Sequence, residues 1–158
     1  EVVVIPDNLS KKIEDSNSAE TSNNKVTTLA QFAQKRLENF EYKFVDASML
    51  SAIEKANFDL IDRVFNLIGG KPLQVKSILI SETMQKDPTT FYACTGLWKS
   101  ETGQIIILRR ILANREKFLG TLLHELAHAI SGYQDATRGF ESELTRLLGQ
   151  VMNVALKS

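Results

Sequence analysis

The stretch LLHELAHAI, residues 122–130, holds both histidines of a chain of 158 residues. His124 and His128 stand four positions apart, so on a helix they lie on one face, one turn apart. Two imidazole nitrogens at this spacing can bind one zinc ion. Glu125 lies about 100° round the helix from His124, where its carboxylate can reach a water molecule on the metal without becoming a ligand. The motif predicts a catalytic zinc centre.

The same stretch has an ordinary alternative, a buried helix whose histidines are hydrogen-bonded in the core. A short motif of this kind is common by chance in large sequence collections, because few positions are fixed. In a chain with only two histidines, however, this spacing with a following glutamate would arise on the order of one time in a thousand. The motif also falls on an amphipathic pattern directly after a predicted strand. We therefore favour metal binding.

A catalytic zinc ion takes three protein ligands and keeps one position for water. The chain has no third histidine, and we expect its one cysteine, Cys94, to be a small core residue. Glu141 lies closer than Glu143 to the middle of an apolar helical stripe, where a carboxylate is costly unless a positive group meets it. Glu141 is therefore the predicted third ligand, with Glu143 and then Asp135 as alternatives. In the ordinary interpretation these acids solvate the last helix or stabilise its first turn.

Local patterns predict the elements that position the motif. A helix begins near Asn114 and ends at Gly132, and a last helix runs from about Thr137 to Leu156. Both have apolar residues spaced by three and four. The inward residues are Phe118, Leu122, Leu126 and Ile130 in the first, and Phe140, Leu144, Leu147, Leu148 and Val151 in the second.

Strands are predicted before the motif. VKSILI (75–80) is rich in β-branched residues, and GLWKS and QIIILRR flank the turn-like SETG (100–103) as an antiparallel hairpin. We expect an α+β fold in which a small antiparallel or mixed sheet of about three strands packs on helices. The helix that carries the motif is then followed by a C-terminal helix.

The first half of the chain carries fewer signals. Residues 7–25 have few large apolar side chains and many Ser, Asn and charged residues, so burial cannot offset the entropy lost on ordering them. We predict a linker or mobile arm over residues 1–26 and one domain over 27–158. Within this domain a first helix is expected over 28–40.

A short strand and a second helix should follow. YKFV (42–45) alternates briefly as a strand does, and the helix over residues 50–68 should end at Gly69 and Gly70. The residues predicted to face inward on this helix are Ile53, Ala56, Leu60, Val64 and Leu67.

Composition excludes some classes of function. Nineteen Lys and Arg balance nineteen Asp and Glu, so there is no overall charge bias toward nucleic acid or anionic lipid. No apolar run is long enough to span a membrane, and the opening EVVVIP lacks the features of a signal peptide. We expect a cytoplasmic protein that does not bind membranes, with nucleic acid an unlikely partner. Because the chain begins at Glu1 without a methionine, we also expect an upstream domain.

HELAH on a helix resembles the motif of the zincin metallopeptidases, with gluzincin-like ligands. The run ESELTRLLGQVM from Glu141 resembles the Glu-x-x-Ala-Asn-x-Phe-Ala-x-x-Leu-Leu run of compact bacterial zinc peptidases that cleave phage-type repressors or govern the radiation response. Leu144, Thr145, Leu147 and Leu148 stand where that family has Ala, Asn, Phe and Ala. TRGFE (137–141) resembles C-terminal domains of bacterial proteins with a heat-shock-type ATPase module, and the resemblance as a whole covers residues 104–152.

The resemblance implies a zincin-like fold, zinc held by His124, His128 and Glu141, and Glu125 as general base. Glu125 would take a proton from the metal-bound water and pass it to the leaving amine. Tyr133 and Arg138, just past the motif helix, are candidates by position to stabilise the oxyanion, although each is more often a surface residue. The strand QIIILRR would present its edge to an extended peptide, as the strand before the active helix commonly does in zincins.

The function predicted from the sequence is a zinc-dependent endopeptidase acting on a specific protein target. The alternative is a non-catalytic zinc domain that recognises a protein or nucleic-acid partner. Glu125 discriminates between them, because a structural zinc site closes its fourth position with a protein ligand and needs no acid beside a water molecule. We therefore favour the enzyme.

Overall fold

The computed structural model describes residues 40–85 and 94–157. The chain divides into two units, residues 1–41 and 42–158, and the elements below belong to the second. The predicted arm over residues 1–26 lies outside the described residues. So does the predicted helix over 28–40, except for Phe40, which is not helical.

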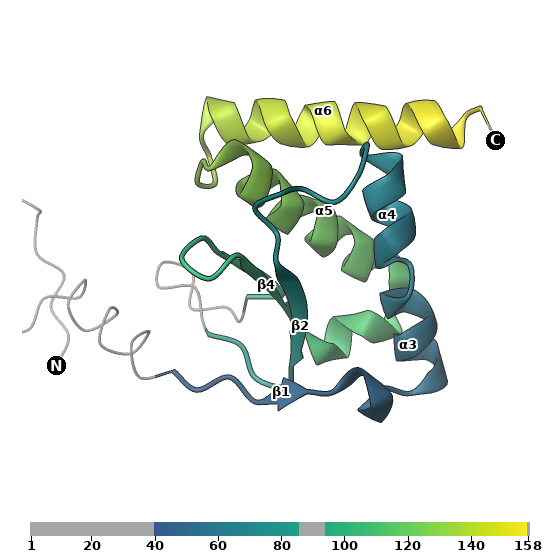
Figure 1. Cartoon of the computed structure of the whole chain (residues 1–158), viewed down its shortest axis with the longest axis vertical. Helices are drawn as coiled ribbons and strands as arrows, with labels where there is room; N and C mark the ends of the chain where they lie inside the picture. The colour runs from purple at the N-terminus through teal and green to yellow at the C-terminus, as the bar shows by residue number, and fades with distance from the viewer. Residues whose placement is uncertain (1–39, 86–93, 158) are drawn as a thin grey trace, which may run out of the picture. The chain divides into compact units, whose positions relative to one another are not determined.

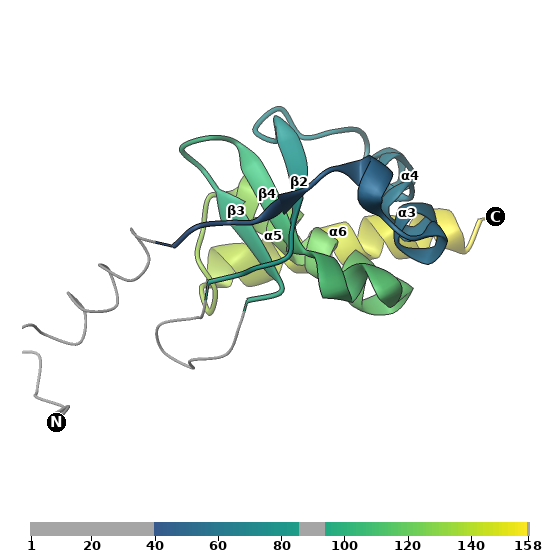
Figure 2. The ribbon, with the colours of Figure 1, turned by 90° about the horizontal axis from the view of Figure 1, so that it is seen from below.

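A mixed four-stranded sheet with the order β1-β2-β4-β3 forms one layer of this unit (Figure 2). Its strands are β1 (Phe44–Val45), β2 (Ser77–Ser81), β3 (Gly96–Lys99) and β4 (Gln104–Leu108). β2 and β4 are parallel, whereas β1 pairs antiparallel with β2, and β3 with β4. The predicted hairpin is confirmed. The expected number of about three strands is too low, because part of YKFV pairs with β2.

β4 lies inside the sheet and is buried on both faces. Ile105 and Ile107 pack against the helices, while Ile106 and Leu108 pack with Met84 on the other face. A continuous run of β-branched residues suits this doubly buried position. The expectation that this strand offers an edge to a peptide is wrong, because β2 and β3 occupy both of its edges. The edge strand beside the motif is β3.

Two long helices follow the sheet, and α5 lies between the sheet and α6 (Figure 1). α5 spans Arg115–Ser131 and α6 spans Arg138–Ala155. The Asn114 side chain accepts a hydrogen bond from the Lys117 N–H at the start of α5, and Gly132 ends it with a φ of 70°. These boundaries confirm the sequence prediction, because caps are local signals. On α6, Leu148 is half-exposed and does not belong to the buried stripe.

The predicted helix over residues 50–68 is two helices, α3 (Ala52–Phe58) and α4 (Ile61–Leu67). Its predicted inward face is partly wrong, since Ile53 and Ala56 are exposed. Asn57 is buried instead, and its side-chain amide donates to the Leu112 carbonyl at 2.7 Å. This polar anchor fixes the face of α3 that is buried.

Two short 3-10 helices complete the described elements. They are η1 (Ala47–Met49) and η2 (Arg109–Ala113). η2 connects β4 directly to α5, so the motif helix begins where the central strand ends. Within residues 40–85 and 94–157, no helix has the length and apolar character needed to cross a membrane.

Candidate metal centre

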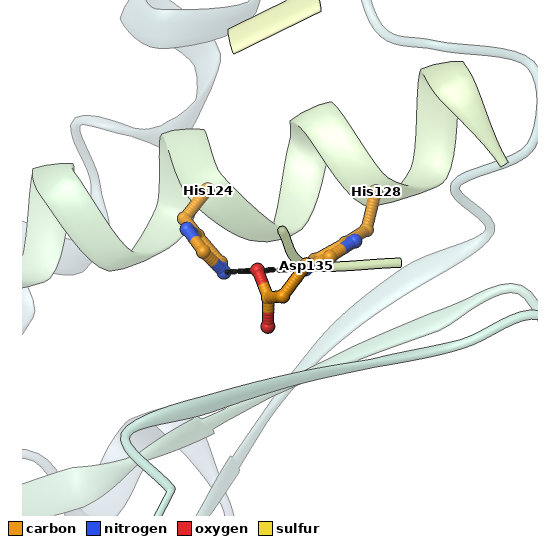
Figure 3. Close-up of side chains that lie close together, drawn as sticks. All are labelled: His124, His128 and Asp135. Carbon is orange, nitrogen blue, oxygen red and sulfur yellow. Dashed lines mark hydrogen bonds and ion pairs between the residues drawn. The ribbon is translucent and has the colours of Figure 1, made fainter. Parts of the chain in front are cut away.

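Three ligand groups converge at the end of α5. His124 Nε2 and His128 Nε2 lie 3.2 Å apart, and Asp135 Oδ1 lies 3.1 Å from the first and 3.3 Å from the second. Figure 3 shows both imidazoles pointing from the helix toward this carboxylate. Asp135 belongs to the short loop between α5 and α6. Within the described residues, these are the side chains that form a group able to hold a metal ion.

The spacing of the three atoms fits a tetrahedral zinc ion. Bonds from zinc to nitrogen or oxygen are about 2.0 to 2.2 Å long, which separates two ligands of a tetrahedron by roughly 3.3 to 3.6 Å. The observed separations of 3.1, 3.2 and 3.3 Å lie at the short end of that range or up to 0.2 Å below it. Two imidazoles and one carboxylate are also a ligand set that zinc accepts in catalytic sites.

The protonation of His128 also favours a cation at this point. Its Nδ1 lies 2.7 Å from the Tyr133 carbonyl oxygen, which can only accept, so Nδ1 carries the proton. If the ring carries no second proton, its Nε2 presents a lone pair to the Asp135 carboxylate at 3.3 Å. Two lone pairs at this distance repel unless a proton or a metal cation lies between them. Such an outer hydrogen bond to a backbone carbonyl is typical of metal-binding histidines.

Phe140, in the first turn of α6, packs against both histidine rings. Its ring stacks on His128 with a centroid distance of 4.2 Å and meets the edge of His124 at 4.8 Å. Burial lowers the pKa of His124 below its ordinary value, the neighbouring His128 adds to this, and Asp135 opposes it. A neutral imidazole is the form that binds a metal.

Glu125 is buried beside this centre. Burial raises the pKa of its carboxyl group to about 7, the negative charge of Asp135 adds to the rise, and a hydrogen bond from the Trp98 backbone opposes it. A carboxylate that titrates near neutral pH is suited to take up and release a proton.

β3 approaches α5 closely at Glu125 because Gly96 has no side chain. A methyl group at Gly96 would lie 2.5 Å from Thr121 Cγ2 and 2.7 Å from Glu125 Oε1. The Leu108 N–H donates to the Thr95 carbonyl, so the register of the hairpin turns the backbone polar groups of Gly96 and Trp98 away from β4. The Trp98 N–H is thus directed to the Glu125 carboxylate.

A cleft of about 960 Å³ exposes the centre along β3 and α5. Backbone and side chains of β3, including Gly96 and Trp98, line one part of it. Thr121, Glu125 and the loop after Gly132 also line it. Both histidines and Asp135 face this same cleft, so a bound molecule would meet the candidate metal ligands and the buried acid together.

The structure brings together most of the predicted residues, but not Glu141. His124, Glu125 and His128 share the cleft, whereas Glu141 is exposed in the first turn of α6 and outside the metal-ligand group. The reason is the helical rotation between neighbours, since Phe140 occupies the face toward the histidines. Glu143 is held by an ion pair with Arg146. Asp135, the last of the three candidates, takes the third position in the group.

Of the two candidates for oxyanion stabilisation, only one lies in the cleft. Tyr133 lines the cleft and is 57% exposed, whereas Arg138 is exposed at the start of α6 and does not line it. Cys94 is half-buried at the margin of the cleft and packs with the small apolar cluster on the outer face of the sheet, as expected of a core residue.

Sequence reasoning undervalued Asp135 because its place depends on the path of a loop. Gly132 turns the chain with a positive φ, and Ala136 does so again with a φ of 58°. Asp135 lies between these two turns in the chain, and its carboxylate contacts both histidines. The sequence signal that could have identified Asp135 is its position three residues after Gly132, the glycine that ends the helix.

No family model, curated protein or solved structure matches this chain. The resemblance to zincins therefore stays a prediction.

Proposed function

We propose that this protein is a zinc-dependent endopeptidase with a zincin-like arrangement of its motif helix and edge strand. One observation carries the proposal: three converging candidate ligand atoms face the same cleft as the buried carboxyl group of Glu125. His124, His128 and Asp135 would hold the ion, and Asp135 replaces Glu141 in the predicted ligand set. Zinc in such a site acts as a Lewis acid that polarises a carbonyl group and acidifies water.

The side chains around the ion would have different roles in the reaction. Glu125 would accept a proton from the attacking water and deliver it to the leaving amine, and the Trp98 N–H would hold its carboxylate in one orientation. Tyr133 lines the cleft and stays the candidate donor to the developing oxyanion. Arg138 is not proposed for that role, because it lies outside the cleft.

An extended peptide is the substrate that the cleft suits best. β3 is an edge strand whose Gly96 and Trp98 turn their backbone polar groups away from β4. The Trp98 N–H is directed to Glu125, so a peptide would pair with the Gly96 backbone groups and the Trp98 carbonyl. Main-chain pairing places a peptide bond in the cleft with few demands on side chains. A protein target would have to present such a segment in a flexible region.

The experiment compares metal content and cleavage in the same preparations. We expect about one zinc per chain in the wild type and cleavage of unstructured protein substrates such as casein. Glu125→Gln should keep the metal and lose at least about 100-fold of the activity, whereas His124→Ala should lose both. Full zinc occupancy without any cleavage by the wild type would instead favour the non-catalytic zinc domain.

A further inference from the structure

We propose that Gly139 and Phe140, in the first turn of α6, are positioning residues of the metal centre. This inference rests on the metal site of the proposed function but not on the peptidase reaction. Neither residue offers an atom that could bind zinc. They act through the side chains and the backbone carbonyl that they contact.

The absence of a side chain at Gly139 leaves the space that the Tyr133 ring occupies. A methyl group at Gly139 would overlap that ring and would lie only 2.8 Å from its Cγ atom. The ring thus contacts the backbone of α6 directly, in space that the side chain of any residue other than glycine would occupy. Since Tyr133 belongs to the short loop after α5, this contact ties the loop to the following helix.

The contact between the Tyr133 ring and Gly139 determines where the Tyr133 carbonyl oxygen lies. That oxygen accepts a hydrogen bond from Nδ1 of His128 at 2.7 Å, which fixes the ring plane and leaves Nε2 free to bind a cation. A shift of the loop would move this acceptor and, two residues further on, Asp135. One contact at Gly139 therefore supports two of the three ligands.

Phe140 orients the imidazoles from the other side. Its ring lies nearly parallel to His128, at 22°, and meets His124 at 65°. The side chain is 4% exposed and its backbone N–H donates to Thr137 Oγ1 in the helix cap, so it has little freedom to move. The two histidines are thereby held between their own helix and the start of α6.

The test measures the zinc dissociation constant by competition with a chromophoric chelator. Gly139→Ala should raise it about 10- to 100-fold, the usual cost of losing an outer partner of a metal ligand. Gly149→Ala is the matched control, because it makes the same change in the same helix with nothing within 4 Å of the added methyl group. It should leave the constant unchanged.

A double substitution distinguishes the loss of the contact between Tyr133 and Gly139 from a general effect of the alanine on α6. Tyr133→Ala removes the ring and should itself weaken zinc binding, and adding Gly139→Ala in this background should then cost nothing more. If Gly139→Ala does not fold by circular dichroism, Phe140→Leu gives the second measurement, with an expected loss of about tenfold or more.

The outcomes distinguish the inference from the proposed function. A wild type that binds no zinc overturns the metal centre and the inference with it. A wild type that binds zinc, together with folded Gly139→Ala and Phe140→Leu variants of unchanged affinity, overturns the inference alone and leaves the proposed peptidase standing.

Discussion

Asp135 differs from its two partners in exposure. Its side chain is 68% exposed, whereas those of His124 and His128 are 38% and 15% exposed. The histidines are held by α5 and by Phe140, but the carboxylate reaches them from a loop. Asp135 is therefore the candidate ligand whose role is most open to direct test.

We expect Asp135→Ala to weaken zinc binding by more than about 100-fold, because a direct ligand should matter more than an outer partner. Glu141→Ala is the matched control, since it also removes an exposed carboxylate near the start of α6 and should leave the affinity unchanged. Titration of each purified variant with zinc measures the difference. A larger loss in Glu141→Ala than in Asp135→Ala would restore the ligand set predicted from the sequence.

Gly96 is the second residue whose role can be isolated. Gly96→Ala forces β3 away from Thr121 and Glu125, which should cost about 1 to 3 kcal/mol of unfolding free energy and remove the Trp98 contact that orients the carboxylate. Cleavage should fall while zinc remains bound. Urea unfolding and metal content measure the two effects.

Gly120→Ala, in the helix α5 that β3 contacts, is the comparison variant. Gly120 lies in α5 with nothing within 4 Å of an added methyl group, so this variant should gain up to about 1 kcal/mol of unfolding free energy from helix propensity. Equal stability of the two alanine variants would show that the close approach at Gly96 is not required.

At the scale of elements, Arg109 joins three parts of the chain that precede the motif helix. Its guanidinium donates to Glu54 of α3, to Glu82 after β2 and to the Met49 carbonyl of η1. Two basic residues at the end of a strand, such as Arg109 and Arg110, are often only solvated. The contacts show instead that Arg109 anchors η2, and with it the start of α5.

This anchor should make stability depend on pH. The hydrogen bond from Arg109 lowers the pKa of Glu54 to about 2, and the Ser51 backbone N–H adds to the lowering. Because the folded pKa lies below the ordinary value of 4.5, the stabilisation is complete above about pH 4.5 and is lost as the pH falls toward 2. We expect Glu54→Gln to lower the urea midpoint clearly at pH 7, less at pH 3 and hardly at pH 2.

The control for this prediction is Glu101→Gln in the exposed turn between β3 and β4. In the part of the chain that the structure describes, no arginine pairs with Glu101. Its replacement should leave the midpoint nearly constant at all three values of pH. A loss for Glu54→Gln that does not shrink on acidification would contradict a role for the ionised carboxylate.

The elements that could be predicted are those fixed by neighbouring residues. Asn114, Gly132 and Thr137 bound α5 and α6 through local caps, so the motif was placed correctly. The buried face of α3 was predicted incorrectly in part, because Asn57 is buried by a contact with Leu112, far along the chain. The central position of β4 and the approach of Asp135 were missed for the same reason, since strand order and loop paths are set by tertiary packing.

At the scale of the whole molecule, zinc should act as a cross-link. His124 and His128 belong to α5, whereas Asp135 belongs to the connection to α6, so an ion bound to all three restrains the packing of the two helices. An ion that binds the folded chain and not the unfolded one stabilises it by about 2.7 kcal/mol at a concentration 100-fold above its dissociation constant. For a unit of this size the melting temperature should rise by roughly 10 °C.

Thermal unfolding with zinc and with a chelator therefore reports on the centre without any knowledge of the substrate. Asp135→Ala should abolish the zinc-dependent rise, Glu141→Ala should retain it, and Glu125→Gln should retain it as well because Glu125 is not a ligand. The last variant is decisive for function: a normal rise combined with lost cleavage separates metal binding from proton transfer. If Glu125→Gln loses the rise instead, the buried glutamate serves the fold of the site, and its proposed place in the chemistry is wrong.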